Sequence, residues 1–355
     1  MGAPSLGSLL TDVALPLVYV AALWVIGVII SAAAGARDGV VLAGSGLLVS
    51  TALAAVVGVA QAFVWFPFGW GAFLVAGAAA AVLAALGGAI VRRLLPRVVP
   101  PVRPWSTQTW TALAWTALGL LVSSTLAFSV VWVAGGRTLE TVSQTWDAIF
   151  DANAVRFAED SGTIAPTRLT AFAFEEVGQG YYPSTFHTLA MLFMRLAGAD
   201  AVVATNVVAG LIGGGIWVSA VVLGTRYVLG RSWRITLAAG ICSWGFYTGP
   251  WGPLGWGVLW ATALAASVAP LALAGGAALL GVTPARHDRI AAGAVTVGGL
   301  GFLALLHPRV AVIVMVLLGG LAIWVFGARA LTAARSGSRP AAVGYAALVA
   351  SLGAA

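Results

Sequence analysis

The sequence predicts an all-α protein: a polytopic transmembrane bundle of about ten helices with one large polar loop. Two observations carry this prediction. The 355-residue chain is 61% hydrophobic and only 8% charged, whereas soluble domains carry about 25% charged residues, and its mean hydropathy is +1.00. Its apolar runs recur at lengths near the ~20 residues that a helix needs to cross the hydrocarbon core, rather than as the ~10-residue alternating strands of a membrane barrel.

The expected spans are the apolar runs themselves. The last run stops without a polar or basic end, so we expect the chain to be the N-terminal part of a longer protein. We divide the sequence into a three-span segment with its linker, 1–109, and a core, 110–355, that carries an outer loop at 135–200. The runs fall at about 13–34, 40–63, 70–91, 110–134, 201–225, 235–249, 254–281, 290–306, 309–327 and 341–355.

Basic residues set the expected orientation. All eighteen are Arg, and they are dispersed at span ends, where they meet anionic headgroups and mark cytoplasmic connections. No aromatic and basic patch accompanies them, so the net charge of +7 does not indicate a nucleic-acid partner. Arg92, Arg93, Arg97 and Arg103 precede the fourth span. We therefore expect a multi-pass plasma-membrane protein whose 135–200 loop is extracytoplasmic.

One short apolar stretch tests this orientation. Residues 184–198 could cross the membrane or lie along the outer surface, as a surface or re-entrant helix. If they crossed, Arg226, Arg231 and Arg234 would fall outside, against the positive-inside rule. We therefore expect a helix that does not cross. Arg309 is then the one Arg on the outer side beyond the loop and this helix.

The interval 135–183 is the acidic part of the chain. It holds seven of the eleven carboxylates against three Arg, a net charge of −4. Thr141 and Gln144 have capping-box spacing, and apolar residues recur at helical spacing from Trp146 to Phe157. The pattern predicts an amphipathic helix lying on the outer leaflet.

Two carboxylates share the opposite face of this expected helix. Asp147 and Asp151 are four residues apart, so their like charges repel and some other group should offset them. The plain alternative is a solvated polar face. A functional face is favoured because a membrane surface neither attracts an anionic face nor requires one for solubility. The same two carboxylates are the expected ligands if a divalent metal is required.

A second candidate group follows in the loop. Glu175 and Glu176 precede a Gly-rich turn with Tyr182, which leads to His187. Carboxylate, phenol and imidazole groups at a membrane surface could bind sugar or metal; the alternative is an ordinary interfacial anchor.

The stretch LLHPR, residues 305–309, interrupts a later apolar run with His307 and Arg309. An intramembrane Arg is costly and marks a functional site by default. The guanidinium fork is suited to a lipid phosphate. A re-entrant turn, or a salt bridge from Arg309 to the acidic loop, is the structural alternative.

Three motifs carry a family resemblance: WDAIFDANAVRFAEDSG (146–162), YYPSTFH (181–187) and LLHPR. In their setting of a multispan protein with a large outer loop, they resemble the GT-C class of membrane glycosyltransferases. More narrowly, they look like an uncharacterised actinobacterial membrane family of unknown function.

The resemblance implies transfer of a sugar from a polyprenyl-phosphate donor to a glycan or lipid acceptor of the cell envelope. It places the catalytic Asp in the first outer loop, as Asp147, the general base. Arg309 would hold the departing polyprenyl phosphate, and His307, Asp151, Glu175, Glu176, Tyr182 and His187 would complete the binding residues. Asp151 stands where this class often carries His, which leaves the metal requirement open.

Two other functions remain open from the sequence. A lipid or polysaccharide transporter or flippase should show ionisable residues at mid-span or paired broken helices, whereas here the charges lie at span ends and in one loop. A non-catalytic scaffold of envelope synthesis would tolerate loss of Asp147.

Overall fold

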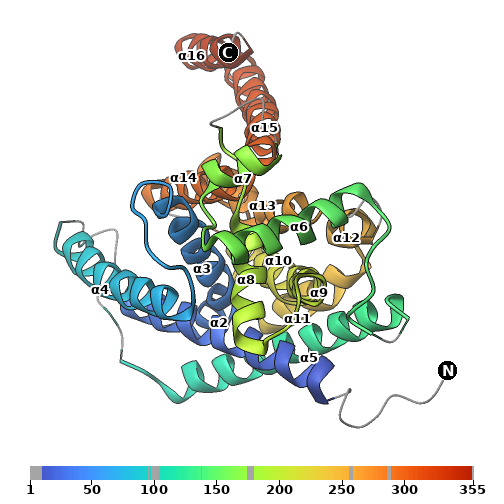
Figure 1. The fold of residues 1–355 in the computed structure, drawn as a ribbon. Helices are drawn as coiled ribbons and strands as arrows, with labels where there is room; N and C mark the ends of the chain where they lie inside the picture. Colours follow the sequence, from blue (N-terminus) through green and yellow to red (C-terminus); the bar gives the residue numbers. More distant parts are fainter. Residues whose placement is uncertain are drawn as a thin grey trace.

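The computed structural model describes residues 10–94, 96, 102, 104–136, 138–173, 180–255, 259–285 and 289–353, and this described part contains helices and no strand. Eight helical segments in it are long and apolar enough to cross a membrane. The predicted polytopic helical bundle is confirmed (Figure 1). The spans are α2 (Leu15–Ala33) with the end of η1 (Leu10–Ala14), α3 (Gly39–Ala60), α4 (Trp70–Leu94), α5 (Thr107–Ala134), the continuous run of α9 (Ala201–Leu211), η3 (Ile212–Ile216) and α10 (Trp217–Leu229), α13 (Trp260–Leu279), α14 (Arg289–Leu306) and α15 (Pro308–Arg335).

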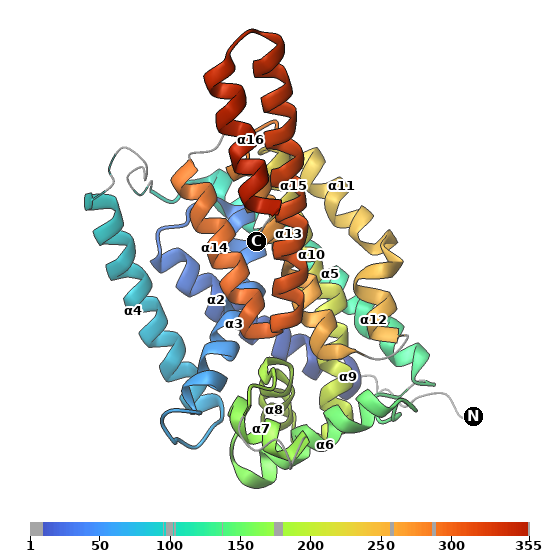
Figure 2. The ribbon, with the colours of Figure 1, turned by 90° about the horizontal axis from the view of Figure 1, so that it is seen from above.

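Two of the ten expected spans form shorter helices. The run at 235–249 becomes α11 (Trp233–Cys242), followed by the short turns η4 (Ser243–Gly245), η5 (Tyr247–Trp251) and α12 (Gly252–Gly255). Gly249 is extended and Pro250 follows it, so the helix cannot continue through this point. Figure 2 shows α11 and α12 following one another down the side of the bundle. The final run forms α16 (Arg339–Gly353), which has only 15 residues.

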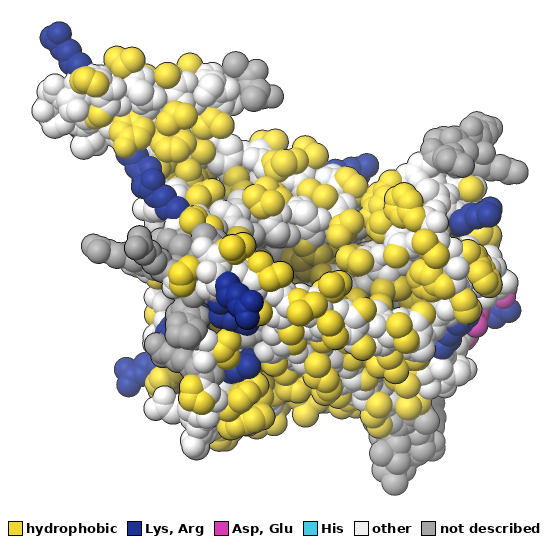
Figure 3. Space-filling view, turned by 90° about the vertical axis from the view of Figure 1, so that its left-hand side faces the viewer, with side chains coloured by type: hydrophobic (Ala, Val, Ile, Leu, Met, Phe, Trp, Pro, Cys, Tyr) yellow, Lys and Arg dark blue, Asp and Glu magenta, His cyan; other side chains and the backbone are white. Residues whose placement is uncertain are grey.

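The bundle has two polar ends of different composition. At one end lie α6 (Trp146–Ser161), α7 (Pro166–Ala173) and α8 (Thr185–Ala197), with the 61–69 connection and residues 307–309 (Figure 2). We call this the loop end. The opposite end, which we call the arginine end, holds residues 34–38, 92–94, 226–234 and 329–339. Figure 3 shows a broad apolar surface between the two ends, with Arg side chains at both edges and the visible acidic side chains at one of them.

Contacts at the arginine end agree with the predicted grouping of basic residues. Arg226 pairs with Asp38 at 2.5 Å, and Arg37 lies 4.9 Å over the ring of Trp105. Arg92 donates to the carbonyl of Ala34 at 3.2 Å. Arg226 therefore lies at the same end as Arg37 and Arg92, as expected if the 184–198 stretch does not cross the membrane.

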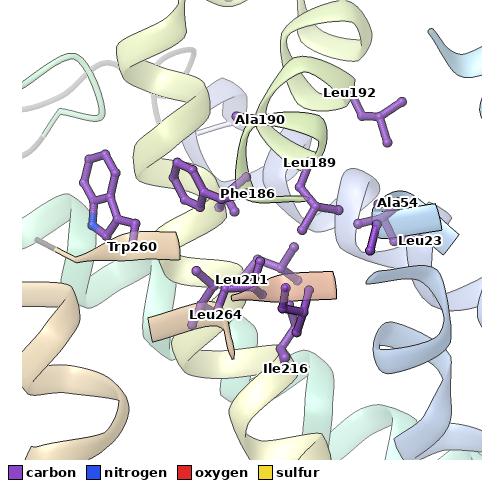
Figure 4. Close-up of a cluster of buried hydrophobic side chains, with 14 of the residues drawn as sticks. Leu23, Ala54, Phe186, Leu189, Ala190, Leu192, Leu211, Ile216, Trp260 and Leu264 are labelled. Atoms are coloured by element: carbon purple, nitrogen blue, oxygen red, sulfur yellow. The ribbon is translucent and has the colours of Figure 1, made fainter. Parts of the chain in front are cut away.

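Helix α8 accounts for that stretch. It has 13 residues, and it lies across the direction of α9 and α10. Figure 1 shows α8 along its length and α9 end-on, and Figure 2 shows the reverse. The prediction of a non-crossing helix agrees with this arrangement. The helix is enclosed by the rest of the protein, because every residue from Thr185 to Met194 is buried; its surface or re-entrant placement in the membrane stays a prediction. Its side chains, Phe186 and Leu189 among them, pack in the central core of the bundle (Figure 4).

Small residues let the spans approach closely, as expected for Gly210 and Gly214. A Cβ built on Gly214 would lie 2.6 Å from the Cβ of Ala127, and one on Gly210 would lie 2.5 Å from the ring of Phe128. Both neighbours belong to α5, so these glycines serve helix packing.

Candidate functional site

Helix α6 holds the two candidate carboxylates. It begins at Trp146, because the Thr145 hydroxyl accepts a hydrogen bond from the Ala148 amide at 3.3 Å, which is N-cap geometry. The expected capping box at Thr141 and Gln144 is wrong, since the helix starts later and the Thr141 hydroxyl instead donates to the Gly135 carbonyl.

The inner face of α6 carries one side of a buried, hydrogen-bonded Asp–His pair. Asp151 is 4% exposed and His187 of α8 is fully buried, and Oδ1 of Asp151 lies 2.9 Å from Nε2 of His187. The alternative of a solvated polar face is therefore wrong for Asp151. His187 is the group that offsets this charge, because a buried carboxylate is tolerated only with a partner.

Burial raises the pKa values of Asp151 and Tyr182. Desolvation raises the pKa of Asp151, and the hydrogen bond from His187 opposes that shift. The pKa of Tyr182 is raised far above its usual value, first by burial and then by the charges of Asp151 and Asp147. The Tyr182 phenol therefore stays protonated and can donate a hydrogen bond. Its ring centre lies 5.8 Å from that of His187.

Asp147 is the accessible carboxylate of the site. It lies one helical turn before Asp151, it is exposed, and its side chain has no hydrogen bond or ion pair within the described residues. Its charge acts on both Asp151 and Tyr182. The neighbouring Trp146 is 91% exposed, so its ring projects outward from the loop end, where interfacial aromatics are favoured.

The sequence LLHPR reaches the same end of the bundle. Arg309 is exposed in the first turn of α15, and its side chain has no hydrogen-bond or ion-pair partner in the described part of the chain. His307 is half-buried, and its pKa is lowered by burial and by the charge of Arg309. The Tyr181 hydroxyl donates to the Leu305 carbonyl. This bond joins the Tyr-Tyr-Pro turn to the LLHPR stretch. Together with the Asp151–His187 bond, it brings all three motifs into contact.

Some of the predicted residues cannot be placed. Glu175 and Glu176 lie outside the described residues. Within the described ranges, no group of three His, Cys, Asp or Glu side chains is arranged to hold a metal ion. Asp151, one of the two expected metal ligands, is instead engaged with His187.

Two residues that position the site were missed by the sequence analysis. The buried Gln61 amide donates to the Gly162 carbonyl at 3.1 Å, and its oxygen accepts from the Ile164 amide at 2.6 Å. Arg195 of α8 pairs with Glu159 at 2.9 Å and donates to the Phe68 carbonyl. The only available signals were a Gln at the end of a span and an Arg in an apolar helix.

Family comparison gives a partial assignment. No curated protein and no solved structure matches the chain significantly. The model of a family of unknown function, DUF6541, matches residues 20–355. Because this match covers nearly the whole sequence, the chain belongs to the DUF6541 family.

Proposed function

We propose that this protein is a membrane glycosyltransferase of the GT-C kind. It would transfer a sugar from a polyprenyl-phosphate donor to a glycan or lipid acceptor, on the side of the membrane that the loop end faces. The observation that carries the proposal is the exposed Asp147 carboxylate, which stands one helical turn from a buried Asp151–His187 pair at the end of the bundle that also carries Arg309.

Asp147 is suited to the acceptor side of the reaction. As the acceptor oxygen attacks the anomeric carbon of the donor, its proton passes to the Asp147 carboxylate. A positioned base of this kind contributes about 10²–10⁴-fold to a rate. The Asp147 side chain is accessible to an acceptor, since it is exposed and has no hydrogen bond or ion pair within the described residues.

The buried pair is suited to a positioning role. Asp151 is too enclosed to meet an acceptor directly, and its bond to His187 fixes α6 against α8. That fixed helix holds Asp147 one turn away. The protonated Tyr182 hydroxyl supplies a hydrogen-bond donor beside the two carboxylates.

The donor side needs a cation. When the bond between the sugar and the phosphate breaks, negative charge develops on the departing polyprenyl phosphate. Arg309 is exposed at the loop end, and its planar guanidinium can donate two parallel hydrogen bonds to phosphate oxygens. Stabilising a charge that develops in the transition state is commonly the largest electrostatic contribution.

The proposal is tested by transfer from a polyprenyl-phosphate sugar, measured with the full-length protein in membranes. Asp147→Asn should lower the rate by at least about 10²-fold while donor binding is kept, because the amide cannot take the proton. Asp160→Asn on the same helix is the matched control and should leave the rate unchanged. Full activity of Asp147→Asn would remove the assignment and favour a scaffold.

Arg309 gives a second, independent test. Arg309→Ala should weaken donor binding, and Arg309→Lys should restore only part of it, because a point charge lacks the fork. A wild-type protein that moves the donor lipid between leaflets without transferring its sugar would favour a flippase instead.

A further inference from the structure

A hollow at the loop end is lined by neither Asp147 nor Arg309. It has a volume of about 620 Å³, within the range of small-ligand sites. One wall is the 61–65 stretch, and the other is formed by the end of α6, the turn after it and the start of α7. The polar groups that line it include Ser161, Thr167 and Arg168, and the apolar ones include Phe63, Trp65 and Phe157.

The two walls are fastened to one another. The Gln61 side chain bonds to backbone groups of Gly162 and Ile164 and to the Thr163 hydroxyl. Phe157 is held from behind by stacking on Phe172, with ring centres 4.8 Å apart. The groove is therefore formed by elements that are tied together, rather than by a chance gap between two loops.

One rim of the groove is strongly apolar. Phe63 is 82% exposed, Val64 65% and Trp65 76%. Three consecutive exposed apolar side chains at the end of a membrane bundle are suited to contact with lipid, and aromatic rings favour the interface. An occupant of the groove would therefore have acyl chains beside this rim.

The polar wall carries an available cation. Arg168 is exposed, and its side chain has no hydrogen bond or ion pair within the described residues. The two carboxylates at the end of α6 are already engaged: Glu159 pairs with Arg195 at 2.9 Å and Asp160 with Arg156 at 3.1 Å. Among the described residues, the unpaired charge that lines the groove is thus positive, with the hydroxyls of Ser161 and Thr167 beside it.

From this arrangement we infer that the groove is a binding site for the phosphate headgroup of an anionic membrane lipid. Arg168 binds the phosphate oxygens, and Phe63 and Trp65 contact the first part of the acyl chains. The lining excludes Asp147, Asp151 and Arg309, so this site does not rest on the proposed glycosyl transfer.

The test uses the full chain in a detergent micelle, titrated with short-chain phosphatidylglycerol, short-chain phosphatidylcholine or sodium phosphate. Binding is read from lipid adducts in native mass spectrometry and from the shift in unfolding temperature, since a ligand of the folded state raises it. Wild type should bind phosphatidylglycerol at least about tenfold more tightly than phosphatidylcholine, as expected for one charge-assisted hydrogen-bonded contact.

Arg168→Gln should abolish this preference, and Arg168→Lys should keep part of it. Arg335→Gln is the matched control, an exposed Arg at the opposite end of the bundle, and should bind like wild type. Trp65→Ala should weaken lipid binding without changing the weak binding of inorganic phosphate. Equal affinities for the two lipids, or equal behaviour of Arg168→Gln and Arg335→Gln, would overturn the site. Inorganic phosphate binding as tightly as phosphatidylglycerol would overturn the lipid assignment in favour of free phosphate.

Discussion

The two polar ends of the bundle use their charges differently. At the arginine end, Arg37 donates to the carbonyls of Ala32 and Ala36, Arg226 pairs with Asp38, and Arg329 donates to the Leu280 carbonyl at 2.6 Å. These guanidinium groups satisfy the free carbonyls or capping residues of helix ends, so their role is structural.

The loop end contrasts with this arrangement. Asp147, Arg168 and Arg309 are exposed and, among the described residues, have no side-chain partner. At the same end, Nδ1 of His187 and Nδ1 of His307 are buried and have no hydrogen-bond partner among the described residues. Buried polar groups without partners are costly, whereas the exposed charges are solvated. Arg93, Arg335 and Arg339 at the arginine end are also exposed without a side-chain partner among the described residues, so the two ends differ in their buried polar groups and in the acidic residues of the loop end. We propose that this difference serves a ligand at the loop end, and folding and orientation at the arginine end.

The strongest test of this comparison asks which end of the bundle faces the cell exterior, where an all-or-none difference is expected. In a Cys242→Ala background, Asn153→Cys at the loop end should react with a membrane-impermeant maleimide in intact cells. Ser336→Cys at the arginine end should react only after the cells are opened, because basic connections stay in the cytoplasm. Labelling of position 336 in intact cells, with position 153 protected, would reverse the orientation of the whole bundle.

The largest expected effect on stability is at the buried pair. His187→Ala would leave the Asp151 carboxylate buried without its partner, at a cost of about 3–5 kcal/mol in the free energy of unfolding. Replacing both residues by Leu should recover most of this loss. Denaturant unfolding in micelles measures the difference. A loss below about 1 kcal/mol for His187→Ala would show that Asp151 finds another partner.

A smaller loss in the free energy of unfolding is expected at the arginine end. Arg226→Ala removes a partly buried partner of Asp38, which also caps α3 by accepting from the amides of Val40 and Val41. We expect a loss of about 1–3 kcal/mol, since the bond is charge-assisted but water still reaches it. The same unfolding measurement applies, and a loss equal to that of His187→Ala would erase the distinction between the two ends.

The smallest loss in the free energy of unfolding is expected at an exposed ion pair on the surface of the loop end. Arg156→Ala breaks the bond to Asp160, and both side chains are more than half exposed. Such pairs contribute about 0.5 kcal/mol or less, so the unfolding midpoint should hardly move. A loss above 1 kcal/mol would mean that α6 depends on its outer face as well as on its bond to α8.

Hydrophobic runs were sufficient to predict most of the bundle. They located all eight candidate spans, since each long helix must be apolar over about 20 residues. Six agree within about four residues at each end, whereas the span at Trp260 begins six residues later than expected and the span at Pro308 ends eight residues later. The run at 235–249 was wrongly predicted to be a span, because apolar composition does not distinguish a straight helix from one interrupted at Gly249 and Pro250. The positions of charged residues also grouped Arg226 with Arg37 correctly.

The site was only partly predictable. The four-residue spacing of Asp147 and Asp151 placed both on one face of a helix, and Tyr182 and His187 were recognised as polar groups in an interfacial stretch. The sequence could not show that Asp151 turns inward to His187, because that contact joins two helices that are not neighbours in sequence. The bonds of Gln61 and Arg195 depend on folded geometry for the same reason.

Matched substitutions at the two ends test most directly whether the loop end carries function and the arginine end carries stability. The measurement is sugar transfer per folded molecule for Asp147→Asn and Asp38→Asn, with the unfolding temperature recorded on the same samples. Asp147→Asn should lower transfer by at least about 10²-fold at an unchanged unfolding temperature. Asp38→Asn should lower the unfolding temperature while each folded molecule keeps its rate. A normal transfer rate for Asp147→Asn, or a transfer defect in Asp38→Asn at full stability, would contradict the claim.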